Sequence, residues 1–296
     1  MNRYGRSDLA CESFSESEDL PKGAKQLSER IGGFGISRLH ISSEEAAKAL
    51  GKPCGTYVTV ECGRLGSISE NDADCLAHLL AGELRGMASK LTGLVPDADF
   101  GVFVAGLGNA ELTADAIGPK TVSLLTATRH LREHEGGLYR RLGCSSLSAL
   151  APGVLGQTGI ETLELLRGAV RYVRPDVVLL IDALAARSCD RLAATVQISD
   201  IGISPGSGVG NHRLAITNES LGVPVIALGV PTVVNSSTLV YDALTEAGIH
   251  DLDESLRRVL ENGRSFFVSL KESDVITHEV ARLLSKAIGL AFTAGY

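Results

Sequence analysis

Two aspartates follow apolar stretches in this sequence. Asp182 ends the aliphatic run DVVLLID (176–182), and Asp115 lies six residues after Asn109, behind the apolar stretch 99–109. The carboxyl ends of parallel strands meet at one sheet edge, so both aspartates would lie there if the two stretches are neighbouring strands. Two close carboxylates cannot both ionise cheaply, so one keeps a proton while the other acts as a base. Such a pair can activate a water to attack a peptide carbonyl and then protonate the leaving amine. From the pattern alone, a strand end or a helix cap remains open for either residue.

Glycine-rich turns are the next candidates. Gly106, Gly108 and Asn109 form a predicted tight turn beside Asp115, and a second turn lies in SPGSGVGN (204–211). A glycine turn after a strand can also cradle phosphate, so a nucleotide-binding module is an alternative. Neither stretch is a GxGxxG motif and no Walker lysine follows. Turns that border a cleft are therefore the prediction.

Other chemistry-bearing side chains form no recognised motif. His130 and His134 are four residues apart and could share a helix face as metal ligands, although a solvated helix end explains them as well. Cys189 is the best-placed thiol for nucleophilic chemistry, and a packed thiol is its alternative.

The composition limits the partners. The formal net charge is −7, only 4% of residues are aromatic and tryptophan is absent, which argues against nucleic-acid binding. The six cysteines show no CxxC pair, as in a cytoplasmic protein with reduced thiols. The start of the chain lacks an apolar core segment typical of a secretory signal, and the longest apolar run is shorter than the roughly 18 residues of a membrane helix. We expect neither a nucleic-acid nor a membrane partner.

Strand-like and helix-like segments alternate along the chain. Strands are predicted over 56–62, 99–109, 176–182, 194–200 and 223–229, with a short one near 265–270. Helices are predicted over 71–91, 156–173, 236–248, 251–263 and 273–289, the second opening with a capping box from Thr158 to Glu161. This order predicts an α/β fold with a mostly parallel, mixed sheet and helices on both faces. The first 25 or so residues are polar and serine-rich, which predicts a mobile arm.

Six segments together resemble the germination protease (GPR endopeptidase) family of spore-forming Firmicutes. They are RSDLACE (6–12), GLGNAELTADAIGP (106–119), LAPGVLGQTGIET (150–162), IDALAARS (181–188), TVQISDIGISPGSGVGN (195–211) and LGVPVIALGVPTVV (221–234). These segments span nearly the whole chain in order.

The resemblance implies a self-processing zymogen that degrades small acid-soluble spore proteins during germination in the spore core. It also implies a cytoplasmic homotetramer, no cofactor, and Asp115 and Asp182 as an aspartic-type catalytic pair. The family fold is phosphorylase/hydrolase-like and resembles hydrogenase-maturation peptidases, in which corresponding acidic positions bind a metal together with a histidine. Here the comparable stretch offers Ser204 and no histidine, so no metal is expected. A metal-dependent maturation peptidase remains the alternative enzyme.

The family's cleavage preference maps onto the N-terminal segment. It favours an acidic residue before the cut, a hydrophobic residue after it and then alanine, which fits Asp8, Leu9 and Ala10. Residues 1–8 would thus be a propeptide and 9–296 one peptidase domain. Gly5 departs from the family, which prefers an acid there. Arg187 would orient acidic substrate groups or pair with a neighbouring carboxylate. The region between 234 and the last helix is shorter than in longer members.

Overall fold

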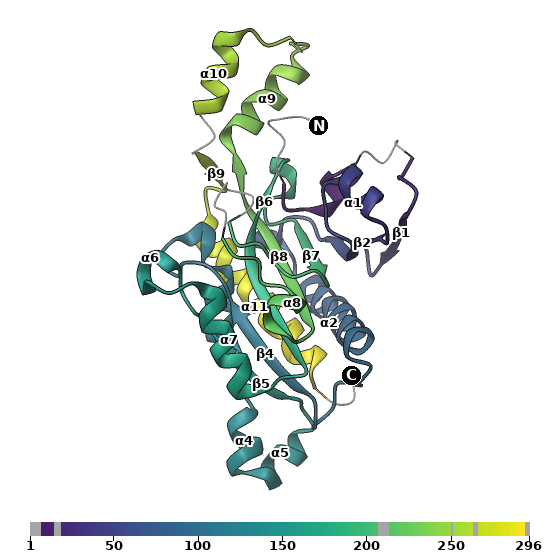
Figure 1. Ribbon diagram of the computed structural model, residues 1–296, viewed down its shortest axis with the longest axis vertical. Helices are drawn as coiled ribbons and strands as arrows, with labels where there is room; N and C mark the ends of the chain where they lie inside the picture. The colour runs from purple at the N-terminus through teal and green to yellow at the C-terminus, as the bar shows by residue number, and fades with distance from the viewer. Residues whose placement is uncertain (1–6, 15–18, 207–212, 250, 263–265, 294–296) are drawn as a thin grey trace.

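A central mixed sheet organises the chain (Figure 1). The computed structural model describes residues 7–14, 19–206, 213–249, 251–262 and 266–293. Within these ranges nine strands form one sheet in the order β1-β2-β3-β7-β8-β6-β4-β5, with β9 beside β8. The strands are β1 (Ala24–Ile31), β2 (Phe34–Ile41), β3 (Gly55–Glu61), β4 (Gly101–Gly106), β5 (Ser146–Leu150), β6 (Val177–Ala186), β7 (Thr195–Ser199), β8 (Val225–Asn235) and β9 (Phe267–Ser269).

The sheet has a parallel part and an antiparallel part. Strands β5, β4, β6 and β8 run parallel, whereas β7, β3, β2 and β1 continue from β8 with antiparallel pairing. The mixed α/β sheet predicted from the sequence is confirmed, and its parallel pairing is limited to four strands. β6 is nearly all aliphatic because a parallel strand in this position is covered on both faces.

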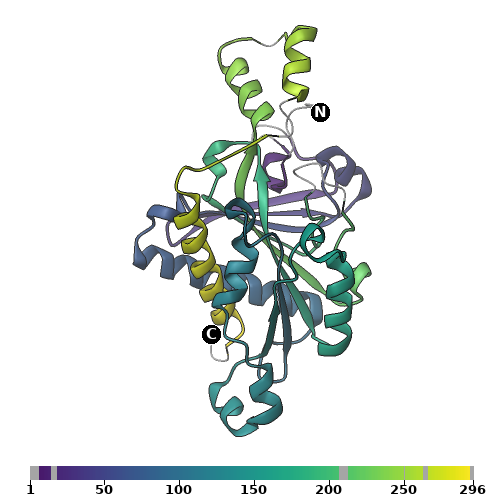
Figure 2. The same ribbon diagram turned by 90° about the vertical axis from the view of Figure 1, so that its left-hand side faces the viewer.

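Helices cover both faces of the sheet (Figures 1 and 2). Helices α2, α3 and α11 pack together on one face, and α7 and α8 cover the other. The α-helices are α1 (Glu44–Leu50), α2 (Glu70–Thr92), α3 (Ile117–Leu124), α4 (Arg129–His134), α5 (Gly136–Leu142), α6 (Leu155–Thr158), α7 (Thr162–Val173), α8 (Asn218–Leu221), α9 (Ser236–Glu246), α10 (Glu254–Asn262) and α11 (Ser273–Ala291). Four 3₁₀ turns are also described, namely η1 (Ala10–Glu12), η2 (Leu65–Ser67), η3 (Thr113–Asp115) and η4 (Cys189–Arg191).

The helix predicted over 156–173 begins later than expected. Gly159 has a φ of 70° and ends the short α6, so α7 starts at Thr162. Its capping box joins Glu161 and Glu164, and the predicted pairing of Thr158 with Glu161 is wrong. The left-handed glycine between the two segments is the cause, because it interrupts the helical backbone.

Strand β6 continues past the point where the apolar run stops. It extends to Ala186, so Asp182 lies within the strand and not at its end as predicted. The register between β6 and β8 shifts after Leu184, opposite Pro231, which lacks an N–H for the ladder. Because β4 ends at Gly106, opposite Ile181, β6 extends beyond β4 from Asp182 onward.

The N-terminal segment is docked where it is described, contrary to the predicted mobile arm. Leu9 is 0% exposed and packs against residues of β6 and β8, and Ala10 packs beside α1 and the strands β2 and β3. The polar composition of the segment suggested a mobile arm, but the apolar residues Leu9 and Ala10 are buried and hold the segment against the sheet. Gly5 and the rest of 1–6 lie outside the described residues.

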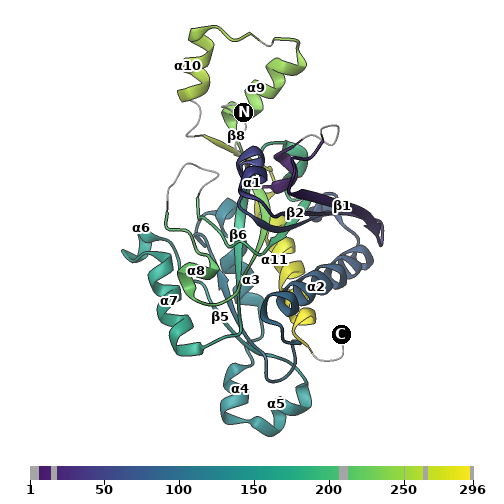
Figure 3. The same ribbon diagram turned by 45° about the vertical axis from the view of Figure 1, so that its right-hand side comes forward.

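Helices α9 and α10 form a hairpin that projects from the end of the sheet (Figures 1 and 3). This hairpin and β9 lie in the region between residue 234 and the last helix, which is shorter than in longer family members. Helix α10 confirms the helix predicted over 251–263, and β9 confirms the strand predicted near 265–270. In the described part of the chain, no helix combines the length and apolar character needed to cross a bilayer.

Candidate active site

Asp182 is a buried carboxyl group on the outer part of β6. Asp182 is 7% exposed, and its Oδ1 accepts a hydrogen bond from the Ala183 N–H at 3.0 Å. Burial of a carboxyl with so few donors favours its protonated form. The strand therefore supplies a carboxyl group that holds its proton more tightly than a solvated one.

Asp115 reaches the same cleft from a loop. It ends η3, and its Oδ2 accepts a hydrogen bond from the Asn109 N–H at 2.8 Å. Two hydroxyl groups fasten this loop to the body of the protein. Thr232 Oγ1 on β8 donates to the Ala114 carbonyl at 2.6 Å, and Thr277 Oγ1 on α11 donates to the Thr113 carbonyl at 3.3 Å.

The predicted glycine turn allows this close packing. Gly108 has a φ of 110°, and a Cβ atom there would lie 2.1 Å from the Asp115 carbonyl oxygen. A Cβ on Gly106 would lie 2.2 Å from the Gly118 carbonyl oxygen. Only glycine fits either position without displacing the loop. Asn109 anchors the turn further, since its Oδ1 accepts a hydrogen bond from Gln157 Nε2 at 2.8 Å.

Both carboxyl groups have raised pKa values, and the charge of Asp115 contributes to the shift of Asp182. Burial raises the pKa of Asp182 well above its ordinary value, and the negative charges of Asp115 and Asp8 raise it further. Burial also raises the pKa of Asp115, opposed by the Asn109 N–H and the positive charge of Arg213. The pair is thus suited to carry one proton between two carboxyl groups.

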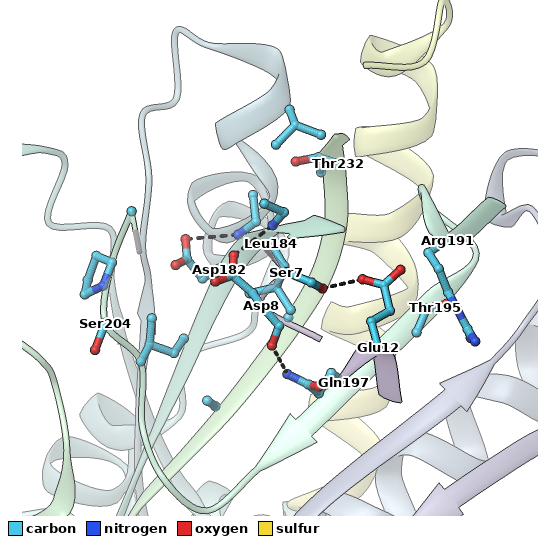
Figure 4. A pocket seen from close by; sticks show the side chains of 18 of the residues that line it. Ser7, Asp8, Glu12, Asp182, Leu184, Arg191, Thr195, Gln197, Ser204 and Thr232 are labelled. Carbon is cyan, nitrogen blue, oxygen red and sulfur yellow. Dashed lines mark hydrogen bonds between the residues drawn. The ribbon is translucent and has the colours of Figure 1, made fainter. Parts of the chain in front are cut away.

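A large cleft contains both groups, and Figure 4 shows Asp182 in it beside Asp8. Its volume is about 1980 Å³, and Asp115 and Asp182 both line it. Small-molecule sites usually occupy about 300–1,000 Å³, so this cleft suits a polymer such as an extended peptide better. The rim includes Ser204 and Gly206 from the second glycine-rich stretch, of which 207–211 lie outside the described residues.

The N-terminal segment of the chain lies in this cleft beside Asp182. The Asp8 N–H donates to the Ala185 carbonyl at 2.9 Å, and the Ala185 N–H donates to Asp8 Oδ2 at 2.9 Å. Leu9 is buried among Leu184, Ala186 and other apolar residues of the same cluster. The peptide bond between Asp8 and Leu9 is therefore held in the cleft on both of its sides.

Further contacts hold the segment before and after that bond. Lys52 Nζ donates to the Ser7 carbonyl at 2.8 Å, and the carboxylate of Glu12 accepts the N–H groups of Arg187 and Ser188 at 2.8 and 2.9 Å. Burial lowers the pKa of Lys52, and the negative charges of Asp8 and Glu12 oppose that effect. The sequence carried no signal for these contacts, because they join residues that are far apart in the chain.

Gln197 is another residue of the site that the sequence did not predict. It lies on β7 and is 7% exposed, and its side-chain amide contacts the main chain of the docked segment (Figure 4). The available signal was the long polar side chain in the strand TVQIS, in which Thr195 and Ser199 are also polar and buried. Such a position is also common in ordinary strands, so the pattern alone would not have singled it out.

The remaining sequence candidates have structural partners or surface positions. The Arg187 guanidinium pairs with Asp242 at 3.0 Å, which is the neighbouring-carboxylate alternative. His130 and His134 are exposed on α4, and burial raises the pKa of the Cys189 thiol, which disfavours a thiolate nucleophile. No group of three or more His, Cys, Asp or Glu side chains is arranged to hold a metal among the described residues.

Known protein sequences match most of this chain. A family model described as germination protease matches residues 8–250. The chain is 42% identical to a germination protease of Caldanaerobacter subterraneus subsp. tengcongensis over 98% of this chain and 94% of that protein. It is 43% identical to one of Clostridium perfringens, over 81% of this chain and 70% of that protein. Among solved structures, the [NiFe] hydrogenase maturation protease HycI of Thermococcus kodakarensis aligns with a TM-score of 0.34 and 16% identity, over 65% of this chain and 93% of that one.

Proposed function

The chain belongs to the germination protease family, and we propose that it is a self-processing endopeptidase with an aspartic-type mechanism. The family makes it a peptidase of spore germination. The single observation that supports the mechanism is that two carboxyl groups, the buried Asp182 and the half-buried Asp115, line one cleft together with a peptide segment.

In the proposed reaction the pair shares one proton. The ionised carboxylate accepts a proton from a water molecule, whose oxygen forms a bond to the carbonyl carbon of the substrate. The protonated carboxyl group then donates its proton to the leaving nitrogen, the carbon–nitrogen bond breaks, and an acid and an amine result. The raised pKa of Asp182 supports a proton on the pair at pH values where a solvated carboxyl group is already ionised. Because the two groups titrate together, this proton is a property of the pair and is not assigned to one oxygen.

We assign the bond between Asp8 and Leu9 as the self-processing site. The docked segment presents an acidic residue, a buried leucine and alanine in the order that the family resemblance implies. Cleavage there releases residues 1–8 as a propeptide and leaves 9–296 as the peptidase domain. Small acid-soluble spore proteins are the proposed substrates, and the proposed enzyme is a homotetramer without a cofactor in the cytoplasm of the spore core.

Substitution of each aspartate tests the mechanism. Asp115→Asn and Asp182→Asn should each slow the loss of residues 1–8 by at least about 10³-fold, because the pair loses either its base or its acid. Intact-mass measurement over time gives the rate, and thermal unfolding shows that the variants stay folded. Asp190→Asn is the matched control, since Asp190 lines the same cleft and should leave processing unchanged.

Two outcomes would contradict the proposal. Processing of either variant at the wild-type rate would remove that aspartate from the mechanism. Processing and cleavage of a spore protein that stop with a chelator and return with zinc or nickel would favour a metal-dependent peptidase instead.

A further inference from the structure

Three residues form a row across the sheet beneath the docked segment. In the strand register, Asp182 on β6 lies opposite Gly229 on β8, and Gly229 lies opposite Gln197 on β7. Residues opposite one another in neighbouring strands project from the same face. With a strand spacing of about 4.8 Å, the Asp182 and Gln197 backbones are about 10 Å apart.

Gly229 leaves the middle of this row without a side chain. A Cβ atom there would lie 2.5 Å from the Leu184 side chain, which packs over this position. The row therefore has a carboxyl group at one side and an amide at the other, with only a glycine between them.

The Gln197 side chain contacts the main chain on both sides of the Asp8–Leu9 bond. Its Nε2 donates to the Asp8 carbonyl oxygen at 3.2 Å, and its Oε1 accepts the Ala10 N–H at 2.6 Å. The Asp8 carbonyl is the group that water would attack in self-processing. One neutral side chain thus holds the reacting carbonyl and fixes the residue two positions later.

We propose that Gln197 is a catalytic residue that stabilises the negative charge on the carbonyl oxygen of the bond being cut. This inference rests on the proposed peptidase function. When the water oxygen bonds to the carbonyl carbon, the electron pair of the C=O double bond moves to the oxygen that Gln197 Nε2 contacts. The water proton goes to the ionised carboxylate, and the glutamine neither gains nor loses a proton. The electron pair returns when the bond to the Leu9 nitrogen breaks.

The neutral charge of the donor is consistent with the site. A lysine or arginine at this position would favour ionisation of the nearby carboxyl groups and would remove the proton that the leaving nitrogen needs. An amide donates a hydrogen bond without that effect. Donors that are fixed before the reaction are effective because they need no reorganisation when charge develops.

Gln197→Glu separates this role from simple anchoring. The glutamate keeps an oxygen to accept the Ala10 N–H but replaces the donor to the Asp8 carbonyl with a second acceptor. We expect self-processing to slow by about 10²–10³-fold, the usual effect of removing one such donor. Hydrogen exchange at Ala10, measured in the Asp182→Asn background so that the segment stays uncut, should remain as protected as with Gln197.

Two further variants complete the experiment. Gln197→Met removes both contacts at similar size and should slow processing at least as much, with weaker protection of Ala10. Thr195→Val is the matched control, because Thr195 is a buried polar residue two positions earlier on β7 that also lines the cleft. This control should process at the wild-type rate.

The possible results separate the two proposals. If both Gln197 variants process within about threefold of the wild type, the inference is wrong. It is also wrong if Gln197→Glu loses protection at Ala10 in proportion to its rate, since Gln197 would then only anchor the segment. Activity that survives Asp182→Asn would instead overturn the peptidase mechanism itself.

Discussion

The two candidate catalytic aspartates are positioned in different ways. Asp182 lies in a long strand whose aliphatic neighbours are buried on both faces, so the core of the sheet fixes it. Asp115 lies on a loop that depends on glycines with close backbone contacts and on hydroxyl groups from β8 and α11. A strand tolerates many local changes, whereas the loop depends on a few contacts that can be removed one at a time.

Among changes that leave both aspartates in place, the largest effect on the Asp115 loop should come from Gly108→Ala. The added Cβ would overlap the Asp115 carbonyl oxygen, and alanine disfavours a φ of 110°, so the loop must shift. A displacement of about 1 Å at a reacting group can cost about 100-fold in rate, and we expect self-processing to slow by that order. The measurement is the rate of loss of residues 1–8.

The control for this substitution is Gly93→Ala. Gly93 also has a positive φ of 71°, but a Cβ there meets nothing within 4 Å. It should lower stability by about 1 kcal/mol and leave the processing rate unchanged. Equal rate losses in both variants would show that strain anywhere in the fold, not the Asp115 loop, limits processing.

The pH dependence of stability should separate the two aspartates next. A carboxyl group with a raised pKa in the folded state stabilises the fold at low pH, and this contribution is lost as pH rises through the folded pKa. An asparagine cannot ionise, so the Asp182→Asn variant does not lose this contribution as the pH rises. The difference between its melting temperature and that of the wild type should therefore become more positive from about pH 4 to about pH 8. The sign of this change follows from the raised pKa of Asp182 in the folded protein.

Asp115→Asn should show the same sign with a smaller change. Asp115 is less buried, and its negative charge is stabilised by the Asn109 N–H and by Arg213. Thermal unfolding of the two variants and the wild type across the pH range measures both. A larger pH-dependent change in melting temperature for Asp115→Asn than for Asp182→Asn would contradict the prediction that Asp182 has the more strongly raised pKa.

The smallest effects should come from removing the two hydroxyl groups that hold the Asp115 loop, and Thr232→Val is the first of these changes. This change keeps the shape of the side chain and removes the hydroxyl that donates to the Ala114 carbonyl at 2.6 Å. A net hydrogen bond contributes about 1 kcal/mol, so processing should slow about threefold to fivefold. Thr277→Val removes the longer bond of 3.3 Å and should slow processing less. The opposite order would assign the loop position mainly to α11.

The sequence predicted the strand-borne aspartate better than its surroundings. The aliphatic run of β6 and the glycine turn after β4 predicted that Asp182 and Asp115 share one sheet edge if the two strands are parallel neighbours, and β4 and β6 do pair in parallel. The docking of Leu9 and Ala10 was not predictable, since it depends on residues about 175–190 positions away. Gln197 looked like any polar residue in a strand, and only the register with Gly229 and Asp182 sets it apart.

The docked segment is extended where the proposed cut occurs, with Leu9 at a φ of −75° and a ψ of 131°. Around that bond the Asp8 N–H, the Asp8 carbonyl and the Ala10 N–H all bond to the cleft. A helix would use these main-chain groups for its own i to i−4 hydrogen bonds. A helical target must therefore unwind locally before it can bind in this manner, so the cost of that unwinding would enter the rate. The cleft would thereby distinguish disordered chains from folded ones, independently of their sequence.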